Sequence, residues 1–226
     1  MKSTSCSSCL LKSKAVINLG DNELDILDKS CVQATFDRGE TIFKQGALSS
    51  NIIYLQTGLI KLMIKGPNRV QILRLKKAPC YLGLPTTMGD KINNYSASAL
   101  EKSTACFIDM NTFKELLRIN PAFSYEIIIE LCKNELEQFK RCVTLVQNQI
   151  FGRLASNLIS FADDIYSSHE YDLPLNRNEL ADLVCTSRET ISRILSDLTK
   201  ERIIEANGKH IKIINYNMLK EISRKG

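Results

Sequence analysis

The chain has 226 residues, of which 44% are hydrophobic, so it is long enough for one large domain or two modest ones and has ample apolar side chains for a core. Its formal net charge of +5 is only mildly basic, which favours a positive surface confined to one part of the chain. No apolar run approaches the roughly 18 residues that a membrane-spanning helix needs, and the first residues lack the apolar stretch of a secretion signal, so we expect a cytoplasmic protein with no membrane partner.

Residues 1–20 form an N-terminal segment whose distinctive feature is a Cys-x-x-Cys pair, Cys6 and Cys9. The chain has eight cysteines, and in the cytoplasm we expect them to serve metal binding, redox chemistry or core packing rather than structural disulfides. A single Cys-x-x-Cys pair is a weak signal. It leaves three alternatives open, namely metal or cluster ligands, an accessible thiol pair that oxidises reversibly, and an unstructured tail with spare cysteines.

Short β-rich segments separated by turns occupy much of residues 21–120. They fall at residues 41–43, 52–55, 59–64, 70–75 and 105–108, and glycine and proline residues separate them. This spacing predicts a jelly-roll barrel, also called a double-stranded β-helix, or a related sandwich. Many unrelated proteins share such folds, so this pattern by itself indicates no function.

A long helix with an apolar seam is predicted over residues 121–150. The apolar positions are spaced alternately by four and three residues, and they are Tyr125, Ile129, Cys132, Leu136, Phe139, Val143, Val146 and Ile150. A period of 3.5 favours a partner helix, and about 25 residues at a 1.5 Å rise give a helix nearly 40 Å long. We therefore expect a homodimer. The alternative is that the seam packs on the chain's own β domain.

Two short amphipathic patterns follow a further predicted helix at residues 151–166, and only Cys185 and Thr186 separate them. The first covers residues 175–184. In the second, one face is apolar and consists of Ile191, Ile194, Leu195 and Leu198. The opposite face is polar and consists of Arg188, Glu189, Ser192 and Arg193. Thr186 or Ser187 suits the N-cap, with Glu189 placed for a capping box. This pattern predicts a helix-turn-helix.

A β hairpin is expected after the second helix. Residues 203–206 and 210–214 are mostly apolar, and the pair Asn207 and Gly208 between them is the commonest two-residue signal for a type I′ turn. A helix-turn-helix followed by such a hairpin is the winged pattern. Its second helix is expected to enter the major groove of DNA with its N-terminus first.

Residues 175–214 resemble the winged helix-turn-helix of the Crp/Fnr family of bacterial transcription regulators, and the most specific stretch is SRETISRIL at residues 187–195. Residues 38–46 (RGETIFKQG) and 54–58 (YLQTG) resemble the sensor β-roll of the same family. The resemblance implies an α+β protein with a cyclic-nucleotide-binding-like β-roll at 21–120, a dimerisation helix at 121–150 and a winged helix-turn-helix at 151–226, with a hinge around 147–153. It also implies double-stranded DNA, a second copy of the chain and RNA polymerase as partners.

In this family the side chains at Arg188, Glu189 and Arg193 contact bases of a half-site that contains TGA, and Ser192 matches the serine of the Fnr branch. Arginine matches the O6 and N7 acceptors of guanine, and glutamate accepts from the N4 amino group of cytosine. Because both the Crp-type arginine and the Fnr-type serine are present, TGTGA and TTGA remain open. The side chains expected to contact phosphates are Thr186, Ser187, Arg177, Lys200 and Lys209. In the turn, Cys185 replaces the glycine of many relatives.

The resemblance to a sensor β-roll raises the question of which ligand it binds. Cyclic-nucleotide-binding relatives hold the phosphate with a glutamate and an arginine, and the corresponding stretches here, 81–85 (YLGLP) and 94–97 (NYSA), lack both. Losing that charge-assisted anchor costs about 1.5 to 3 kcal/mol, so we do not expect cyclic AMP to bind. For a different small molecule the expected pocket residues are Arg74, Tyr81, Tyr95 and Ser96.

The iron–sulfur ligand set of the Fnr branch provides a second sensing hypothesis. Cys6 and Cys9 resemble its first two ligands and Cys106 its distant fourth, but Ala15 stands where the third is expected. Such a cluster usually requires four thiolates. Cys31 offers a substitute, although it and Cys106 also stand where cluster-free relatives have buried cysteines. The cofactor therefore remains open.

No enzymatic activity is expected. His169 and His210 are the only histidines, no known motif places a serine or carboxylate beside them, and the chain has no phosphate-binding glycine loop of the Walker type. The alternative to a DNA-binding protein is a ligand-binding protein whose winged module contacts other proteins.

Overall fold

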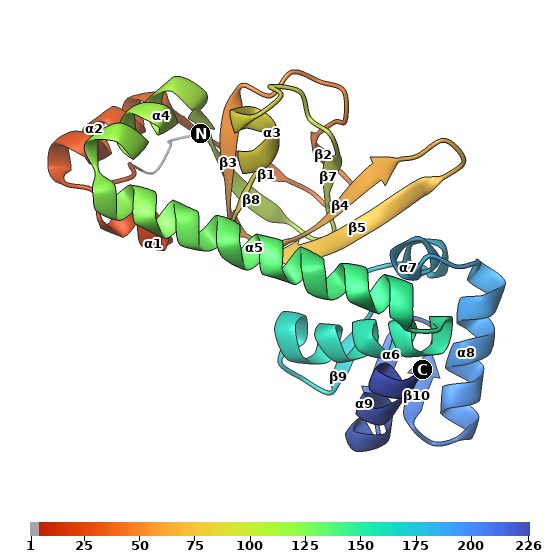
Figure 1. The fold of residues 1–226 in the computed structure, drawn as a ribbon. Coiled ribbons are helices and arrows are strands. Elements are labelled where there is room, and N and C mark those ends of the chain that lie inside the picture. Colours follow the sequence, from red (N-terminus) through yellow and green to blue (C-terminus); the bar gives the residue numbers. More distant parts are fainter. Residues whose placement is uncertain (1–4) are drawn as a thin grey trace. The chain divides into compact units, whose positions relative to one another are not determined.

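The structure is a computed structural model that describes residues 5–226, so residues 1–4 of the expected N-terminal segment lie outside the described part of the chain. The contacts between residues divide the chain into two compact units (Figure 1). Unit 1 runs to Arg69 and from Leu73 to Glu135, and unit 2 comprises Val70–Ile72 and Leu136–Gly226. The division falls within the long helix α5.

Strands predominate in the N-terminal half of the chain and helices in the C-terminal half (Figure 1). The helices are α1 (Lys14–Ile17), α2 (Asp21–Ser30), α3 (Leu84–Met88), α4 (Met110–Ile119), α5 (Pro121–Gln147), α6 (Ile150–Ser160), the π-helix η1 (Phe161–Tyr166), α7 (Arg177–Val184), α8 (Arg188–Lys200) and α9 (Tyr216–Lys225). The strands are β1 (Cys31–Phe36), β2 (Thr41–Phe43), β3 (Asn51–Thr57), β4 (Leu59–Lys65), β5 (Val70–Lys77), β6 (Cys80–Leu82), β7 (Ser96–Ala99), β8 (Ser103–Asp109), β9 (Glu170–Asp172), β10 (Ile204–Asn207) and β11 (His210–Ile213). Among residues 5–226, no helix has both the length and the apolarity to cross a membrane.

The β strands of the N-terminal half form a jelly-roll, as the sequence predicts. One sheet has the strand order β1-β8-β3-β6 and the other has the order β2-β7-β4-β5. All five strand segments expected from the sequence are present, and three further strands, β1, β6 and β7, complete the two sheets. Gly58 makes the tight turn between β3 and β4 with a φ of 98°, and a Cβ there would lie 2.2 Å from the Ser103 hydroxyl oxygen.

The sheet β1-β8-β3-β6 is buried on both faces, because side chains alternate between the faces along each strand. Ile53 and Leu55 of β3 point into the core between the two sheets. Ile52 and Tyr54 point outward into a second apolar core, which α1, α2, α4 and the start of α5 cover. This outward-facing side is where the N-terminal segment lies.

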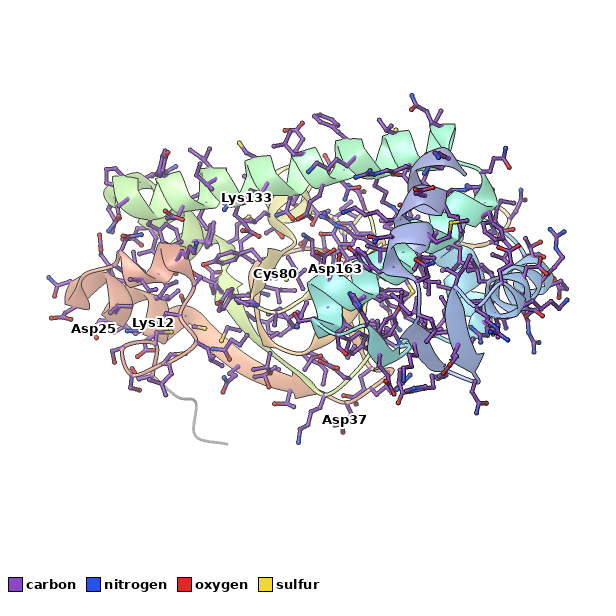
Figure 2. The ribbon with its side chains drawn as sticks, turned by 90° about the horizontal axis from the view of Figure 1, so that it is seen from below. Lys12, Asp25, Asp37, Cys80, Lys133 and Asp163 are labelled. Carbon is purple, nitrogen blue, oxygen red and sulfur yellow. The ribbon has the colours of Figure 1, made fainter. Side chains whose placement is uncertain are left out.

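The N-terminal segment folds onto this outer face. Ala15 and Val16 of α1 are buried, and the hydroxyl groups of Ser13 and Tyr81 are hydrogen-bonded at 2.6 Å. Lys12 of the segment and Asp25 of α2 lie at the same end of unit 1 (Figure 2). The alternative of an unstructured tail is therefore wrong for this part of the chain.

Unit 2 contains the helix-turn-helix and a three-stranded sheet of order β10-β11-β9. The helix expected at residues 151–166 is present as α6 and η1. Between α5 and α6, Asn148 and Gln149 leave the helical conformation, within the range where the sequence places the hinge. Strand β9 and helix α9 were not expected. Strand β9 has only three residues, of which Tyr171 alone is buried, so it gives almost no periodic signal.

The turn of the β10–β11 hairpin differs from the prediction. Asn207 pairs with His210 in the strand register, so the two turn residues are Gly208 and Lys209. Only Gly208 has a positive φ, of 58°. A type I′ turn needs positive φ at both central residues, whereas type II′ needs it at the first alone. The hairpin is confirmed, and the expected type I′ turn at Asn207 and Gly208 is wrong.

Cys185 ends α7 in the left-handed conformation, with φ 64° and ψ 53°. A residue with a Cβ is strained in this conformation by about 1 to 2 kcal/mol. Glycine relieves this strain, but its unfolded chain has more conformational entropy, which offsets part of the gain in stability. We predict that Cys185→Gly raises the free energy of unfolding by about 0.5 to 1 kcal/mol, measured by urea denaturation. Cys185→Ala removes the thiol but keeps the strain, so equal stability of the Gly and Ala variants would contradict this explanation.

Candidate nucleic-acid interface

Helix α8, the second helix of the helix-turn-helix, begins at Arg188, with Ser187 as its N-cap. The Ser187 hydroxyl oxygen accepts a hydrogen bond of 3.2 Å from the backbone N–H of Thr190. Thr190 therefore occupies the third helical position, which a capping box requires for its glutamate. The predicted capping box of Glu189 is wrong because Glu189 lies one position too early.

Helix α7 has the capping box instead. The Asn176 side chain accepts from the backbone N–H of Glu179 at 3.0 Å, and the Glu179 carboxylate accepts from the backbone N–H of Asn176 at 2.8 Å. This cap fixes where α7, the first helix of the helix-turn-helix, begins. Helix α7 in turn packs against α8.

The two faces of α8 are chemically separated as the sequence predicts. The apolar face is at most 3% exposed, and its residues are Ile191, Ile194, Leu195 and Leu198. The polar face is solvent-exposed, and its residues are Arg188, Glu189, Ser192 and Arg193. Hydrogen bonds from its own backbone N–H and from the Ser187 hydroxyl lower the pKa of the Glu189 carboxyl. Glu189 is therefore an anionic acceptor at neutral pH, which a cytosine amino group requires.

A hollow between the start of α7 and the wing turn brings three basic side chains together. Arg177, Arg188 and Lys209 line it, together with Asn176 and Asn178. The Arg177 guanidinium also donates a 2.6 Å hydrogen bond to the carbonyl oxygen of Gly208, so it ties the wing turn to α7. Three cations around one concave surface suit a DNA phosphate.

The other predicted phosphate contacts lie elsewhere. Ser187 is engaged as the N-cap of α8, and the backbone N–H of Thr186 donates to the Ala181 carbonyl oxygen at 3.0 Å. Lys200 lies at the far end of α8, where it faces Asp197 at 4.0 Å. Sequence reasoning did not anticipate the Arg177–Gly208 contact, because it joins residues 31 positions apart.

His210 on strand β11 lies between two carboxylates that no sequence motif predicts. Its Nδ1 is 3.0 Å from Asp172 and its Nε2 is 3.3 Å from Glu170, both on β9. These partners raise the pKa of His210, the hydrogen bond to Asp172 most of all. Both imidazole nitrogens are thereby engaged across the β9–β11 pair, which links the wing strand β11 to β9.

The apolar seam of α5 is largely solvent-exposed in the single chain. Leu136 and Phe139 are each 58% exposed, and Val143 and Val146 are 52% and 78% exposed. Cys132 is also exposed, whereas Ile129 is half-buried. The residues of α5 that pack on the β-roll are Phe123 and Ile127, which lie off the seam. Within unit 1, the residues of α5 that are buried in the outer core therefore differ from the seam residues.

The residues expected to line an effector pocket do not come together. Tyr81 points to the outer face of its sheet and packs against Tyr54 and Phe113. Tyr95 lies on the inner core, where it packs edge-on against Phe43. Ser96 accepts from the backbone N–H of Gln45, and Arg74 is on strand β5 near Tyr95. Because Tyr81 and Tyr95 belong to different cores, one pocket lined by all four residues is not formed.

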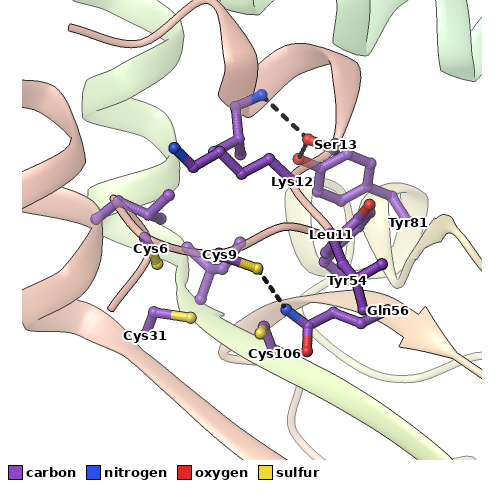
Figure 3. A pocket seen from close by; sticks show the side chains of 13 residues that line it. Cys6, Cys9, Leu11, Lys12, Ser13, Cys31, Tyr54, Gln56, Tyr81 and Cys106 are labelled. Carbon is purple, nitrogen blue, oxygen red and sulfur yellow. Dashed lines mark hydrogen bonds between the residues drawn. The ribbon is translucent and has the colours of Figure 1, made fainter. Parts of the chain in front are cut away.

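Four cysteines surround one small cavity on the outer face of unit 1. They come from three parts of the chain, and they are Cys6, Cys9, Cys31 and Cys106 (Figure 3). The cavity is also lined by Tyr54, Gln56 and Tyr81. Hydrogen bonding with the Cys106 thiol is the largest cause that raises the pKa of Cys31, to about 12. The pKa of Cys6 is raised as well, chiefly by its hydrogen bond with Cys31.

Two family models match the chain. The model described as "Cyclic nucleotide-binding domain" matches residues 33–120, and the model described as "Crp-like helix-turn-helix domain" matches residues 152–222. The matched segments coincide with the jelly-roll and with the helix-turn-helix. The family models thus agree with both parts of the fold.

Curated proteins and solved structures are similar over nearly the whole chain. Electron transport regulator A of Shewanella oneidensis is 29% identical over 222 residues, which is 95% of this chain and 88% of that protein. The fumarate and nitrate reduction regulatory protein of Vibrio cholerae is 26% identical, over 96% of this chain and 90% of that protein. The structure of FixK2 from Bradyrhizobium japonicum superposes with a TM-score of 0.76 at 16% identity, covering 85% of this chain and 96% of that one, and so shows the same fold.

Proposed function

Because the chain belongs to the Crp/Fnr family of transcription regulators, we propose that it binds, as a cytoplasmic homodimer, a near-palindromic DNA site with TGA in each half-site. Members of this family are DNA-binding regulators rather than enzymes. The observation that supports the proposal most strongly is the exposed polar face of α8 opposite a fully buried apolar face. If α8 were only an amphipathic surface helix, it would not need the tight turn that precedes it or the β hairpin that follows it.

Each side chain of this face has a distinct role in the proposal. Arg188 and Arg193 donate to guanine, Glu189 accepts from cytosine, and Ser192 supplies a hydroxyl to a neighbouring base. Arg177 and Lys209 bind phosphate on the hollow beside the wing, which sets the register of α8 on the groove. We propose that the DNA phosphates are also contacted by Lys200, Thr186 and Ser187.

Dimerisation through α5 determines the spacing of the operator. Two copies related by a two-fold axis present two α8 helices to major-groove faces about one helical turn apart, roughly 34 Å. The signal is proposed to act by changing the relative placement of these two helices. Contact with RNA polymerase is proposed from membership of the family.

A gel-shift titration tests DNA binding. The full chain is titrated into a duplex with a TGA-containing palindrome and into a scrambled duplex of equal composition, at several salt concentrations. We expect tighter binding to the palindrome and a steep loss of affinity with salt, because phosphate contacts release counterions. Binding that does not depend on salt, or no binding at any salt, would favour the alternative in which the winged module contacts proteins.

Arg193→Ala tests the assignment of a base contact. We predict that it weakens binding to the palindrome by about 1 to 3 kcal/mol, because one bidentate contact to guanine is lost. The matched control is Arg224→Ala on α9, an exposed arginine outside the recognition helix. If Arg193→Ala weakens binding to the palindrome and to scrambled DNA equally, Arg193 contacts only phosphate.

A further inference from the structure

We propose that His210, held between Asp172 and Glu170, is a proton-operated clamp that fixes the wing hairpin β10–β11 on strand β9 and raises the affinity of the chain for DNA as the pH falls. The effect on DNA rests on the proposed function, whereas the clamp itself does not. The inference is carried by the geometry of the imidazole ring. Both of its nitrogen atoms face carboxylate oxygens, at 3.0 Å for Nδ1 and 3.3 Å for Nε2.

Only the doubly protonated imidazole satisfies this arrangement. An ionised carboxylate accepts hydrogen bonds and cannot donate them, and a neutral imidazole has one nitrogen that donates and one that accepts. When His210 is neutral, one of its nitrogens therefore faces a carboxylate oxygen with no proton between them. When His210 is charged, both nitrogens donate, and each hydrogen bond joins opposite charges. The protonated state thus links the wing to β9 by one more hydrogen bond.

The charges around His210 lie on one exposed face of the sheet β10-β11-β9. The charged side chains on this face come from all three strands, and they are Glu170 and Asp172 of β9, Glu205 of β10 and Lys212 of β11. Asn207, which lies opposite His210 on β10, is uncharged. The Lys212 ammonium lies 3.4 Å from the Glu170 oxygen that His210 does not contact. Loss of the His210 proton therefore leaves a face with three carboxylates one unit more negative.

The clamp lies next to the part of the wing that is proposed to contact phosphate. Lys209, which lines the hollow beside α7, directly precedes His210. The backbone N–H of Leu173 donates a 2.8 Å hydrogen bond to the Lys209 carbonyl oxygen, and Arg177 holds the carbonyl oxygen of Gly208. Both carbonyl groups of the wing turn are thus held, and the clamp acts on the residue that follows them.

The direction of the pH dependence follows from the two carboxylates. They raise the pKa of His210, and the hydrogen bond to Asp172 contributes most. A group with a raised pKa stabilises the folded state fully below its pKa in the unfolded chain, which is about 6.5 for histidine. This stabilisation is lost as the pH rises through the raised pKa. The wing is therefore held most firmly in mildly acidic solution and least firmly in mildly alkaline solution.

The expected effect on DNA affinity is modest for one subunit and is squared in a dimer. At low salt, a unit charge roughly 10 Å from a phosphate in water changes a binding constant about twofold. Two subunits together give about a fourfold change when both His210 side chains lose their protons. Exposed ion pairs contribute little to global stability, so we expect the change in DNA affinity rather than in the unfolding of the whole chain.

The clamp is tested without DNA by NMR titration of the imidazole signals of the full chain. His169 and His210 are the only histidines, so His169→Gln identifies the signals of His210. We expect Asp172→Asn to lower the proton affinity of His210 at least about threefold, because it removes the strongest partner. The matched control is Asp164→Asn, an exposed carboxylate that binds Ser160 and should leave His210 unchanged.

Two results of the titration would overturn the clamp. One is a His210 in the unmodified chain that is half-protonated at or below the pH of an ordinary histidine, about 6.5. The other is an unchanged proton affinity of His210 in Asp172→Asn. The first result needs no variant, so it decides even if Asp172→Asn fails to fold.

The effect on DNA is tested by gel shifts at about pH 6 and about pH 8.5, on either side of the titration. We expect the unmodified chain to bind the palindrome about fourfold more weakly at the higher pH. His210→Gln should bind weakly and His210→Arg tightly at both pH values, while the control His169→Gln should keep the pH dependence. Equal affinity of the unmodified chain at both pH values, or the same loss in His210→Gln, would overturn the effect on DNA. If the chain binds no DNA at any pH, this effect fails together with the proposed function, and the NMR titration still decides on the clamp.

Discussion

Replacing Phe139 by aspartate should convert the protein from a dimer to a monomer, with a dissociation constant at least about 100-fold higher. Phe139 lies in the middle of the seam and is 58% exposed in the single chain. In a two-fold dimer each seam residue is buried twice, once from each copy. The substitution therefore acts at two positions of the same interface.

The magnitude follows from the surface that the dimer buries. Fully burying a phenylalanine side chain contributes about 1.5 to 3 kcal/mol, and roughly half of this remains available for a side chain that is half-exposed. Two copies lose about 1.5 to 3 kcal/mol of apolar burial, and two carboxylates without partners add a desolvation cost. The sum is at least about 3 kcal/mol, which corresponds to the 100-fold change.

The measurement is sedimentation equilibrium over a range of protein concentrations, followed by the gel shift. Gln138→Asp is the matched control, since it introduces the same charge one residue away on an exposed position off the seam. We expect the control to stay dimeric and to bind the palindrome, while Phe139→Asp loses both properties. A Phe139→Asp protein that remains as dimeric as the control would mean that α5 is not the dimer interface.

Local periodicity explains why the sequence predicted the recognition helix and the seam. Ile191 and Leu198 are buried while Arg193 is exposed, because a helix of 3.6 residues per turn separates these positions by simple rotation. The apolar seam that includes Leu136 and Val146 was predicted in the same way, from a spacing of 3.5 residues. Neither conclusion requires knowledge of any residue distant in sequence.

Features that depend on pairing between distant segments were not accessible. Cys31 and Cys106 are 75 positions apart; the sequence mentions them together only through the family resemblance, and it is the β1–β8 register that places them as diagonal neighbours. Tyr81 and Tyr95 face different cores because strand parity decides the direction of each side chain, and a slip of one residue reverses it. The wing turn shifted for the same reason, since the register that pairs Asn207 with His210 leaves Gly208 and Lys209 as the turn.

Phe113→Ala should lower the free energy of unfolding of unit 1 by about 3 to 5 kcal/mol. Phe113 on α4 is completely buried. Its ring packs edge-on against Phe123 with centroids 5.4 Å apart and against Tyr81 at 6.1 Å. It therefore joins α4 and α5 to the outer face of the sheet, and removing it leaves a cavity that its rigid aromatic neighbours cannot fill.

Amide hydrogen exchange shows which part of the chain loses stability in Phe113→Ala, because it reports the opening free energy of each segment separately. Peptides from residues 96–135 should exchange faster in Phe113→Ala, while peptides from residues 150–226 should keep their protection, since they belong to unit 2. Phe113→Leu is the control, because it leaves a smaller cavity and must cost less. Equal costs for the Ala and Leu variants would show that the site relaxes around the missing ring. Equal loss of protection in both units would show instead that they unfold together, so that the outer core stabilises unit 2 as well as unit 1.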